Sequence, residues 1–511
     1  TERPPSIEPG RAVKCGCCST VCADRSVGDS RSGHTAHGYI RNVTADALPT
    51  RLHSFADDAL GEHDAVALAD LVRSGERSAR ELADAAVARA NRVEELAAVA
   101  YPSYHKPLLP AARDGRLYGV PTFVKDNADI AGMPTNQGTA AFLAKPAKEH
   151  GPYSRQFLSA GMTVLGKSSL PEFGFNATTE PPFARPTLNP WHTSHSVGAS
   201  SGGAAALVAS GVVPIAHGND GGGSIRIPAA CTGLVGLKPS RGRHVDTALT
   251  RAMPVNIISE GVLTRTVRDT AAYTAAVEQY WHNPKLPPIG LVEGPPTKPM
   301  RIALVLESIS GPVPQGPIRA AVEQIATTLA AHGHRVEPVA MPFDDTLEVA
   351  FLRYWGLLAA MVASTGKLAD RTFDTSRLDD LTLGLRRYYL RSALSTPKTL
   401  YRLRAAAATY ETTFAPYDAA LLPTLGHETP ELGYLSPTVP FDELLDRLRT
   451  YVAFTPINNI TGTPSISIPA GLTPAGLPIG VQLAGTVGTE RTLLELAYLI
   501  EAEHPFPHLN H

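Results

Sequence analysis

The spacing of apolar residues predicts a chain in which helices and strands alternate. Apolar side chains recur with helical spacing in some segments and form short continuous runs in others. Ser78, with Glu81 three residues later, forms a capping box that begins one of the helices. We expect helices at 65–73, 78–96, 153–160, 204–210, 266–279, 317–331, 490–501 and through 346–413. We expect strands at 117–124, 162–165, 212–216, 300–306, 335–340, 417–422 and 477–483. This alternation predicts an α/β fold, a sheet flanked by helices.

Two glycine clusters, each containing serine, bracket a short apolar segment. The stretch from Ser196 to Arg226 reads SVGASSGGAAALVASGVVPIAHGNDGGGSIR. Glycine runs let a backbone approach a ligand closely and expose its N–H groups. The buried helix and strand expected between the clusters would hold the two serine loops side by side. We therefore expect the functional site of the chain to lie at these two loops.

The second cluster has the composition of an oxyanion hole. The N–H groups of Gly221, Gly222, Gly223 and Ser224 surround one hydroxyl, as preorganised donors must. A phosphate loop would need a Lys-Ser/Thr pair after its last glycine, which is absent here. A nucleophile elbow would need glycine where Arg226 stands. The spacing alone leaves both a nucleophilic Ser224 and a structural turn open.

The length and net charge of the chain indicate which kinds of molecule it binds. The 511 residues can bury a large core, and a net charge of −2 argues against a nucleic-acid or membrane-surface role. No apolar run approaches the roughly 20 residues of a membrane span. We expect a small-molecule substrate, no nucleic-acid partner and no membrane partner.

The first 50 residues differ from the rest of the chain. Residues 1–50 are rich in Arg, Ser, Gly and Pro, and they contain Cys15, Cys17, Cys18 and Cys22. They contain no apolar segment typical of a secretory signal. Zinc sites favour C-x-x-C pairs, which this spacing does not supply. We expect a flexible, dispensable extension.

Residues 51–511 contain no linker that would divide them, and we expect one catalytic domain there. The remaining cysteine, Cys231, lies in an apolar context and is expected to be buried. A single core cysteine without a disulfide partner fits a reducing compartment, so we expect a cytoplasmic protein.

The motifs together resemble the amidase signature family. Ser200 and Ser224 stand 24 residues apart, which matches that family's two catalytic serines. The segment YGVPTFVKDN at 118–127 is similar to its lysine segment. Further likeness covers 178–191, 233–242 and 455–482, and the whole runs from about residue 53 to the end. Amidases of mycobacteria and related actinobacteria, and the cyclic-amide hydrolases of nylon-oligomer degraders, share the most features.

This resemblance implies the amidase-signature fold, a large mixed β-sheet sandwiched between α-helices. It implies an amidase that hydrolyses a small aryl, aliphatic or cyclic carboxamide through an acyl-enzyme, without cofactor or metal. Ser224 would be the nucleophile, Lys125 the base, and Ser200 the bridge between them. The family's bridging serine follows a cis peptide bond, and here Ala199 stands where the family usually has glycine.

Two lysines compete for the role of base. A lysine base must be neutral, and burial favours the neutral form. Lys125 follows an apolar run, although from the residues alone a lysine paired with Asp126 is the preferred interpretation. Lys167 is expected to be a structural residue at a strand end. The resemblance decides for Lys125.

The resemblance also assigns supporting roles. Asp220 and Arg226 would brace the nucleophile loop. Ser201, one residue too close to Ser224 to be the bridge, would be structural.

Three other functions stay open. One is a Ser-His-Asp hydrolase, although none of the 17 histidines lies in a triad motif. A second is an amidotransferase A-type subunit of a tRNA-dependent complex. The third is a phosphate-binding protein without catalytic activity. The oligomeric state is also open, a homodimer included.

Overall fold

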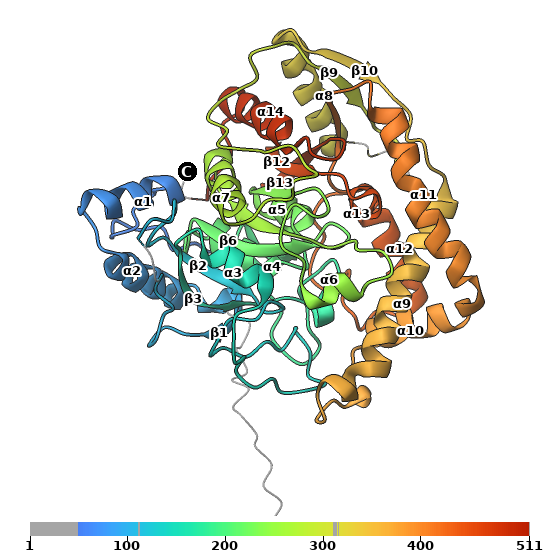
Figure 1. Ribbon diagram of the computed structural model, residues 1–511, viewed down its shortest axis with the longest axis horizontal. Helices are drawn as coiled ribbons and strands as arrows, with labels where there is room; N and C mark the ends of the chain where they lie inside the picture. The colour runs from blue at the N-terminus through green and yellow to red at the C-terminus, as the bar shows by residue number, and fades with distance from the viewer. Residues whose placement is uncertain (1–49, 111–112, 310–313, 315, 510–511) are drawn as a thin grey trace, which may run out of the picture. The chain divides into compact units, whose positions relative to one another are not determined.

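The main sheet is mixed. The computed structural model describes residues 50–110, 113–309, 314 and 316–509. Within them, eight strands form one sheet in the order β10-β9-β11-β13-β12-β7-β8-β6 (Figure 1). Strand β9 pairs in parallel with β10 and β11, whereas the remaining pairs are antiparallel. Their bounds are β6 (Ile215–Asp220), β7 (Val235–Lys238), β8 (Ser259–Thr264), β9 (Arg301–Leu304), β10 (Arg335–Pro338), β11 (Ala419–Pro423), β12 (Ser465–Leu472) and β13 (Pro478–Ala484).

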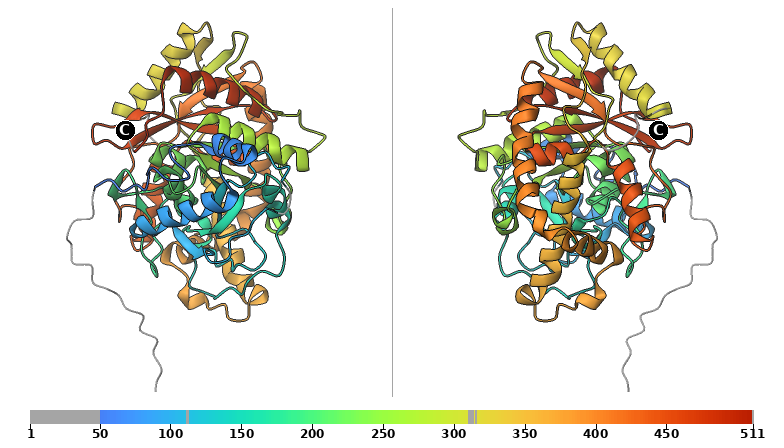
Figure 2. Two further views of the ribbon diagram at one scale, coloured as in Figure 1. Left: turned by 90° about the vertical axis from the view of Figure 1, so that its left-hand side faces the viewer. Right: turned by 90° about the vertical axis from the view of Figure 1, so that its right-hand side faces the viewer.

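Helices cover both faces of this sheet (Figure 2). Ile302 and Leu421 pack in one core with α7 (Val267–Tyr280), α8 (Gly316–Ala331) and α14 (Glu490–Glu503). Their strand neighbours Ala303 and Leu422 pack in another core with α9 (Asp345–Ala369), α11 (Thr396–Phe414) and α13 (Pro456–Thr461). Successive residues of a strand point to opposite faces. The predicted fold class, a sheet sandwiched between helices, is confirmed.

A smaller sheet carries the predicted lysine. Its order is β1 (Val99–Pro102), β3 (Thr163–Ser168), β2 (Pro121–Lys125). It shares a third core with α1 (Ala65–Ser74), α2 (Ala79–Arg92) and α4 (Gly202–Ala209). The Thr122 hydroxyl donates to the Ile215 carbonyl oxygen at 2.9 Å, which ties β2 to β6 of the main sheet. The end of β2 therefore lies beside the edge strand that leads into the loop containing Ser224.

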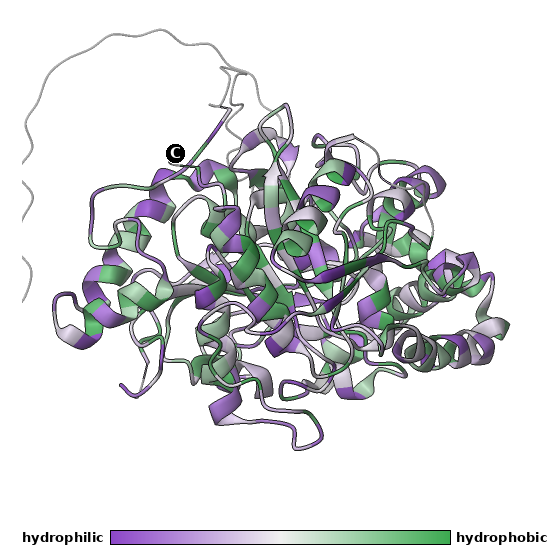
Figure 3. Cartoon of the chain, turned by 90° about the horizontal axis from the view of Figure 1, so that it is seen from above, coloured by the Kyte–Doolittle hydropathy of each residue, from purple (hydrophilic) through white to green (hydrophobic). Residues whose placement is uncertain are grey.

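The other described strands and α-helices are β4 (Leu188–Asn189), β5 (His192–Ser196), α3 (Pro152–Leu158), α5 (Arg226–Thr232), α6 (Ala248–Ala252), α10 (Asp380–Leu390) and α12 (Phe441–Tyr451). In Figure 3 the hydrophobic residues gather in the interior. The capping box of Ser78 and Glu81 is present at the start of α2, as predicted.

Several predicted elements differ in extent. The strand expected at 117–124 begins only at Pro121, and the helix expected at 78–96 ends at Arg92. The strand expected at 212–216 begins only at Ile215 and continues to Asp220. Strand β3 extends to Ser168 and so includes Lys167, which was expected beyond its end. The helical segment expected at 346–413 is divided into α9, α10 and α11. The predictions for 1–50, including the four cysteines, lie outside the described residues apart from position 50.

Among the described helices, α9 has the length and hydropathy of a membrane span. The sequence had suggested that no segment comes close to one. Half of its apolar window is buried within the chain. Its inner residues, such as Tyr354 and Ala359, pack in the hydrophobic cores. This packing accounts for its apolar composition.

Candidate active site

The two serine loops lie against each other. The N–H of Ser201 donates to the carbonyl oxygen of Ser224 at 3.1 Å, so the start of α4 is joined to the loop after β6. The side chains of Ser200 and Ser224 are both buried. The peptide bond between Ala199 and Ser200 is cis, as the resemblance implied.

Lys125 ends β2 with its side-chain amino group in the interior. Its Nζ lies 2.8 Å from Ser200 Oγ, 2.9 Å from Ser201 Oγ and 2.7 Å from Asn219 Oδ1. The residue is 0% exposed, and burial lowers its pKa to about 7 although Glu260 and Asp220 favour the charged form. In the described part of the chain, Lys125 forms no ion pair. The structure thus brings Lys125, Ser200 and Ser201 together.

Lys167 has a different environment. Its Nζ lies 3.1 Å from Asp126 Oδ1 and also contacts the Pro134 carbonyl and the Thr135 hydroxyl. Burial lowers the pKa of Lys167, while Asp126 raises it. Asp126 therefore pairs with Lys167 and not with Lys125, contrary to the interpretation that the residues alone favoured.

Asp220 accepts several hydrogen bonds from the loop that contains Ser224. Its carboxylate accepts from the N–H groups of Gly223 at 2.7 Å and Ile225 at 3.2 Å. It also accepts from Arg226 Nε at 2.9 Å and Nη2 at 3.0 Å. Burial raises the pKa of Asp220, but Arg226 reverses this and holds it well below its usual range. Asp220 and Arg226, which are expected to brace this loop, form a buried ion pair.

The far side of Arg226 is also fully enclosed. Its Nη1 donates to Asn458 Oδ1 at 3.2 Å and to Gln482 Oε1 at 3.1 Å, and its Nη2 donates to Asn459 Oδ1 at 2.7 Å. Sequence reasoning did not single out these three partners. Their only signal was that they lie in the 455–482 segment that carries part of the resemblance.

The predicted oxyanion donors are not equivalent. Because the N–H of Gly223 donates to Asp220, it is already occupied. Within the described residues, nothing accepts a hydrogen bond from the N–H groups of Gly221, Gly222 or Ser224. Gly223 has a φ of 129°, and a Cβ there would lie 2.3 Å from Thr455 Oγ1. The loop therefore requires glycine at this position.

A buried histidine lies behind Lys125. His217, on β6, accepts the backbone N–H of Lys125 on Nδ1 at 3.2 Å. Its Nε2 lies 3.1 Å from Glu260 Oε2, so Nε2 carries the hydrogen and donates to the carboxylate. His217, Asn219 and Glu260 were missed because alternating polar residues did not suggest a buried strand.

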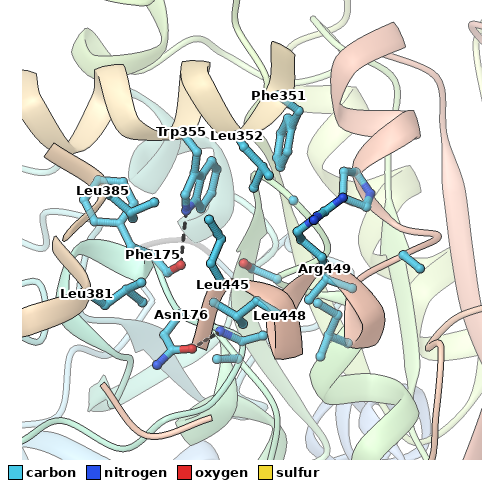
Figure 4. Close-up of a pocket in the computed structure, with 18 of the residues that line it drawn as sticks. Phe175, Asn176, Phe351, Leu352, Trp355, Leu381, Leu385, Leu445, Leu448 and Arg449 are labelled. Atoms are coloured by element: carbon cyan, nitrogen blue, oxygen red, sulfur yellow. Dashed lines mark hydrogen bonds between the residues drawn. The ribbon is translucent and has the colours of Figure 1, made fainter. Parts of the chain in front are cut away.

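An apolar cavity opens beside Ser224 (Figure 4). Aromatic rings from two segments form much of its wall, namely Phe175, Phe351 and Trp355. The Trp355 indole N–H donates to the Phe175 carbonyl at 3.1 Å. Leucines of α10 and α12 form a further part of the wall. The arrangement can enclose an apolar group next to a buried hydroxyl.

Comparison with known proteins places this site in a family. The family model described as Amidase matches residues 75–494. The chain belongs to the amidase family. It is 46% identical over 465 residues to the AmiC protein of Mycobacterium leprae, covering 89% of this chain and 98% of that one. It is 33% identical to the 6-aminohexanoate-cyclic-dimer hydrolase of Paenarthrobacter ureafaciens, covering 87% and 95% of the two chains. This amidase is accordingly a hydrolase that acts on C–N bonds.

Solved structures of amidase-family enzymes have the same architecture. A 6-aminohexanoate cyclic dimer hydrolase matches with a TM-score of 0.79 and 29% identity, over 89% of this chain and 100% of that chain. A bacterial aryl acylamidase of the amidase signature family matches with a TM-score of 0.75 and 27% identity, over 87% and 96%.

Proposed function

We propose that this amidase hydrolyses a small aryl, aliphatic or cyclic carboxamide to a carboxylate and ammonia or an amine, through an acyl-enzyme on Ser224. The observation that carries the proposal is the contact between the buried Lys125 Nζ and Ser200 Oγ at 2.8 Å. A serine hydroxyl is a weak nucleophile and needs a base. A lysine with a pKa of about 7 supplies one near neutral pH.

The surroundings of Lys125 match a neutral amine, which has two N–H groups and one lone pair. Asn219 Oδ1 can only accept, so it takes one hydrogen. The Ser201 hydroxyl lies 3.3 Å from the Asn219 carbonyl and donates there, so its oxygen accepts the second. Nζ also lies 3.3 Å from the Asn219 carbonyl oxygen, its longest contact, and the Ser200 hydroxyl at 2.8 Å then donates to the lone pair. This assignment makes Ser200 the group from which Lys125 takes a proton.

The reaction then proceeds by a relay. Lys125 takes the Ser200 proton, and Ser200 takes the proton of Ser224 as Ser224 Oγ attacks the amide carbonyl carbon. When the C–N bond breaks, Ser200 protonates the leaving nitrogen and recovers a proton from Lys125. Water releases the acyl group through the same relay in a second attack. Within the described residues no hydrogen bond joins the Ser200 and Ser224 hydroxyls, so the relay requires one to form when substrate binds.

Charge developing on the carbonyl oxygen needs donors that are already oriented. The N–H groups of Gly221, Gly222 and Ser224 are proposed for this role. Gly223 is proposed to act differently, because Asp220 uses its N–H to fix the loop. This division refines the set of four donors expected from the sequence.

The nucleophile is tested with Ser224→Ala. We expect hydrolysis of simple amides to be lost while the melting temperature is kept, because one hydroxyl is removed. A fluorophosphonate probe should label the wild-type protein at Ser224. Ser210→Ala is the matched control, since it also removes a buried hydroxyl but one that lies outside the site. If Ser224→Ala is labelled as much as the wild-type protein, Ser224 is not the nucleophile.

The same experiment separates the amidotransferase alternative. An A-type subunit of a tRNA-dependent complex works only within that complex. Hydrolysis of simple amides by the purified chain alone is expected from an independent amidase. If activity appears only when partner subunits are added, the alternative holds instead.

A further inference from the structure

The cavity beside Ser224 contains one pair of charges in an otherwise mainly apolar wall. We infer that this cavity binds the apolar part of an uncharged substrate, and that the Glu348–Arg449 pair makes it discriminate against charged ones. The inference rests on the proposed function, because it takes Ser224 as the reacting residue. It adds the substrate class and two specificity-determining residues.

The apolar wall reaches the nucleophile loop itself. A Cβ placed on Gly222 would lie 3.3 Å from Phe351 Cζ, and one on Gly221 would lie 3.5 Å from Trp355 Cη2. The Trp355 ring lies 5.5 Å from that of Phe351 and 5.6 Å from that of Phe175, between centroids. Rings packed at such distances form a firm surface for an aryl or alkyl group. An apolar substituent of the substrate meets this surface as soon as its carbonyl reaches Ser224.

The charged residues of the wall satisfy each other. Arg449 Nε lies 2.5 Å from Glu348 Oε1, and its Nη2 lies 2.8 Å from Oε2, a bidentate pair between α12 and α9. Glu348 is buried, and it stands one helical turn before Phe351, so both side chains lie on the cavity side of α9. The paired charges sum to zero. A charged substrate group entering the cavity would lose hydration without gaining a partner.

This arrangement predicts opposite effects for the two members of the pair. Glu348→Gln leaves the Arg449 guanidinium with only the exposed Asp446 carboxylate, 3.5 Å from its Nη1, and the buried side of the cavity wall becomes positive. Arg449→Gln leaves the Glu348 carboxylate without its cation, and the wall becomes negative. A purely structural clamp between α9 and α12 would instead make both variants poorer for every ligand alike.

The test uses three fluorophosphonates with six-carbon tails that end in a methyl, an ammonium or a carboxylate group. The rate of Ser224 labelling is measured by mass spectrometry. In the wild-type protein the methyl tail should react about 100-fold faster than either charged tail, because an unpaired charge loses its hydration. We compare the ratio of each charged tail's labelling rate to that of the methyl tail. In Glu348→Gln the ratio for the carboxylate tail should be about 10-fold higher than in the wild type, and in Arg449→Gln the ratio for the ammonium tail should be about 10-fold higher.

Arg447→Gln is the matched control. Arg447 also lies on α12 and pairs with a glutamate, Glu443, but it does not line this cavity. Its three rates should keep the wild-type ratios. Equal wild-type rates for all three tails, or equal changes of all three in both cavity variants, would overturn the inference while leaving Ser224 as nucleophile. No labelling of Ser224 by any tail in folded protein would overturn the proposed function itself.

Discussion

At the scale of single residues, burial rather than an ion pair sets the properties of Lys125. A carboxylate beside a lysine favours the protonated form of the lysine. Asp126 has this effect on Lys167. Lys125 has two hydroxyls and an amide around its Nζ. Its pKa of about 7 follows from lost hydration. The two buried lysines thus differ in their nearest partner, and this difference supports the proposal of Lys125 as the base.

The base should therefore be visible in the pH dependence of activity. Because the neutral form is active, kcat/KM should rise with pH through about 7 and level off above it. Lys125→Ala should lower kcat by about 100-fold or more. Combined with Ser200→Ala, it should be little worse than the more severe single variant, because residues of one relay act as a unit. The measurement is kcat and kcat/KM from pH 5 to 9 for the wild type, both single variants and the double variant.

Lys167→Ala provides the contrast. It leaves Asp126 buried without its cation and should destabilise the fold by about 3 kcal/mol or more. Turnover per folded molecule should be kept. A stable Lys125→Ala protein with near wild-type turnover would rule out the relay, as would a wild-type profile that is flat between pH 6 and 8.

The sequence could predict the proposed reacting residues but not the residues that contact them. Ser200, Ser224 and Lys125 stand in recognisable motifs. Glu260 does not, and the contacts of Glu260 and Asn219 arise only when β6 and β8 are paired at the sheet edge beside β2. Polar residues on such strands look like surface positions until the neighbouring sheet that covers them is known.

At the scale of elements, the site depends on how the loop after β6 is fixed to α5 and α13. Asn459 donates to the backbone carbonyl of Asp220 at 2.8 Å and to that of Ile257 at 3.0 Å. Thr455 donates to the Gly222 carbonyl at 2.7 Å. With the ion pair of Asp220 and Arg226 at its centre, the loop is held by elements more than 200 residues away in sequence.

Breaking this ion pair should destabilise the whole fold. Asp220→Asn leaves Arg226 buried without a countercharge and should cost about 3–5 kcal/mol of unfolding free energy. Arg73→Gln, which breaks the exposed pair with Asp70, should cost less than about 1 kcal/mol. Urea unfolding at neutral pH compares the two.

The pH dependence gives a second test of the same pair. The folded-state pKa of Asp220 lies below its ordinary value of 3.8. Its stabilisation is therefore complete above that value and is lost as the pH falls through the folded pKa. The difference between wild type and Asp220→Asn should persist down to about pH 4 and shrink in stronger acid. A variant as stable as the wild type at pH 7 would contradict the proposed brace.

The displaced start of β6 shows where element prediction failed. Apolar residues from Val212 to Ala216 suggested the strand, but the first of these lie in the turn after α4 and are buried there by tertiary packing. The actual strand is completed by His217, Asn219 and Asp220. These polar residues contact the residues of the candidate site. The apolar pattern that usually indicates a buried strand is therefore missing in this part of β6.

At the scale of the whole molecule, the fold class was predictable and the cavity was not. Alternating helices and strands are visible as local patterns, and they specified the sandwich. The cavity combines Phe175 with residues of α9, α10 and α12, which are separated by up to about half of the chain. Its apolar side chains have the same pattern as ordinary core residues, and only the folded chain places them beside Ser224.

The last prediction concerns how much of the chain the enzyme needs. The match to the Mycobacterium leprae protein covers 98% of that chain but 89% of this one, and the family model begins at residue 75. Residues 1–49 contain few large apolar side chains, so they can bury little surface. A protein that starts at residue 50 should keep its kcat/KM, and its melting temperature should change by no more than about 2 °C. Melting curves, amide hydrolysis and zinc content are compared for the full and shortened chains. Lost activity on truncation, or one zinc per full-length chain, would show instead that the four cysteines have a role in the enzyme.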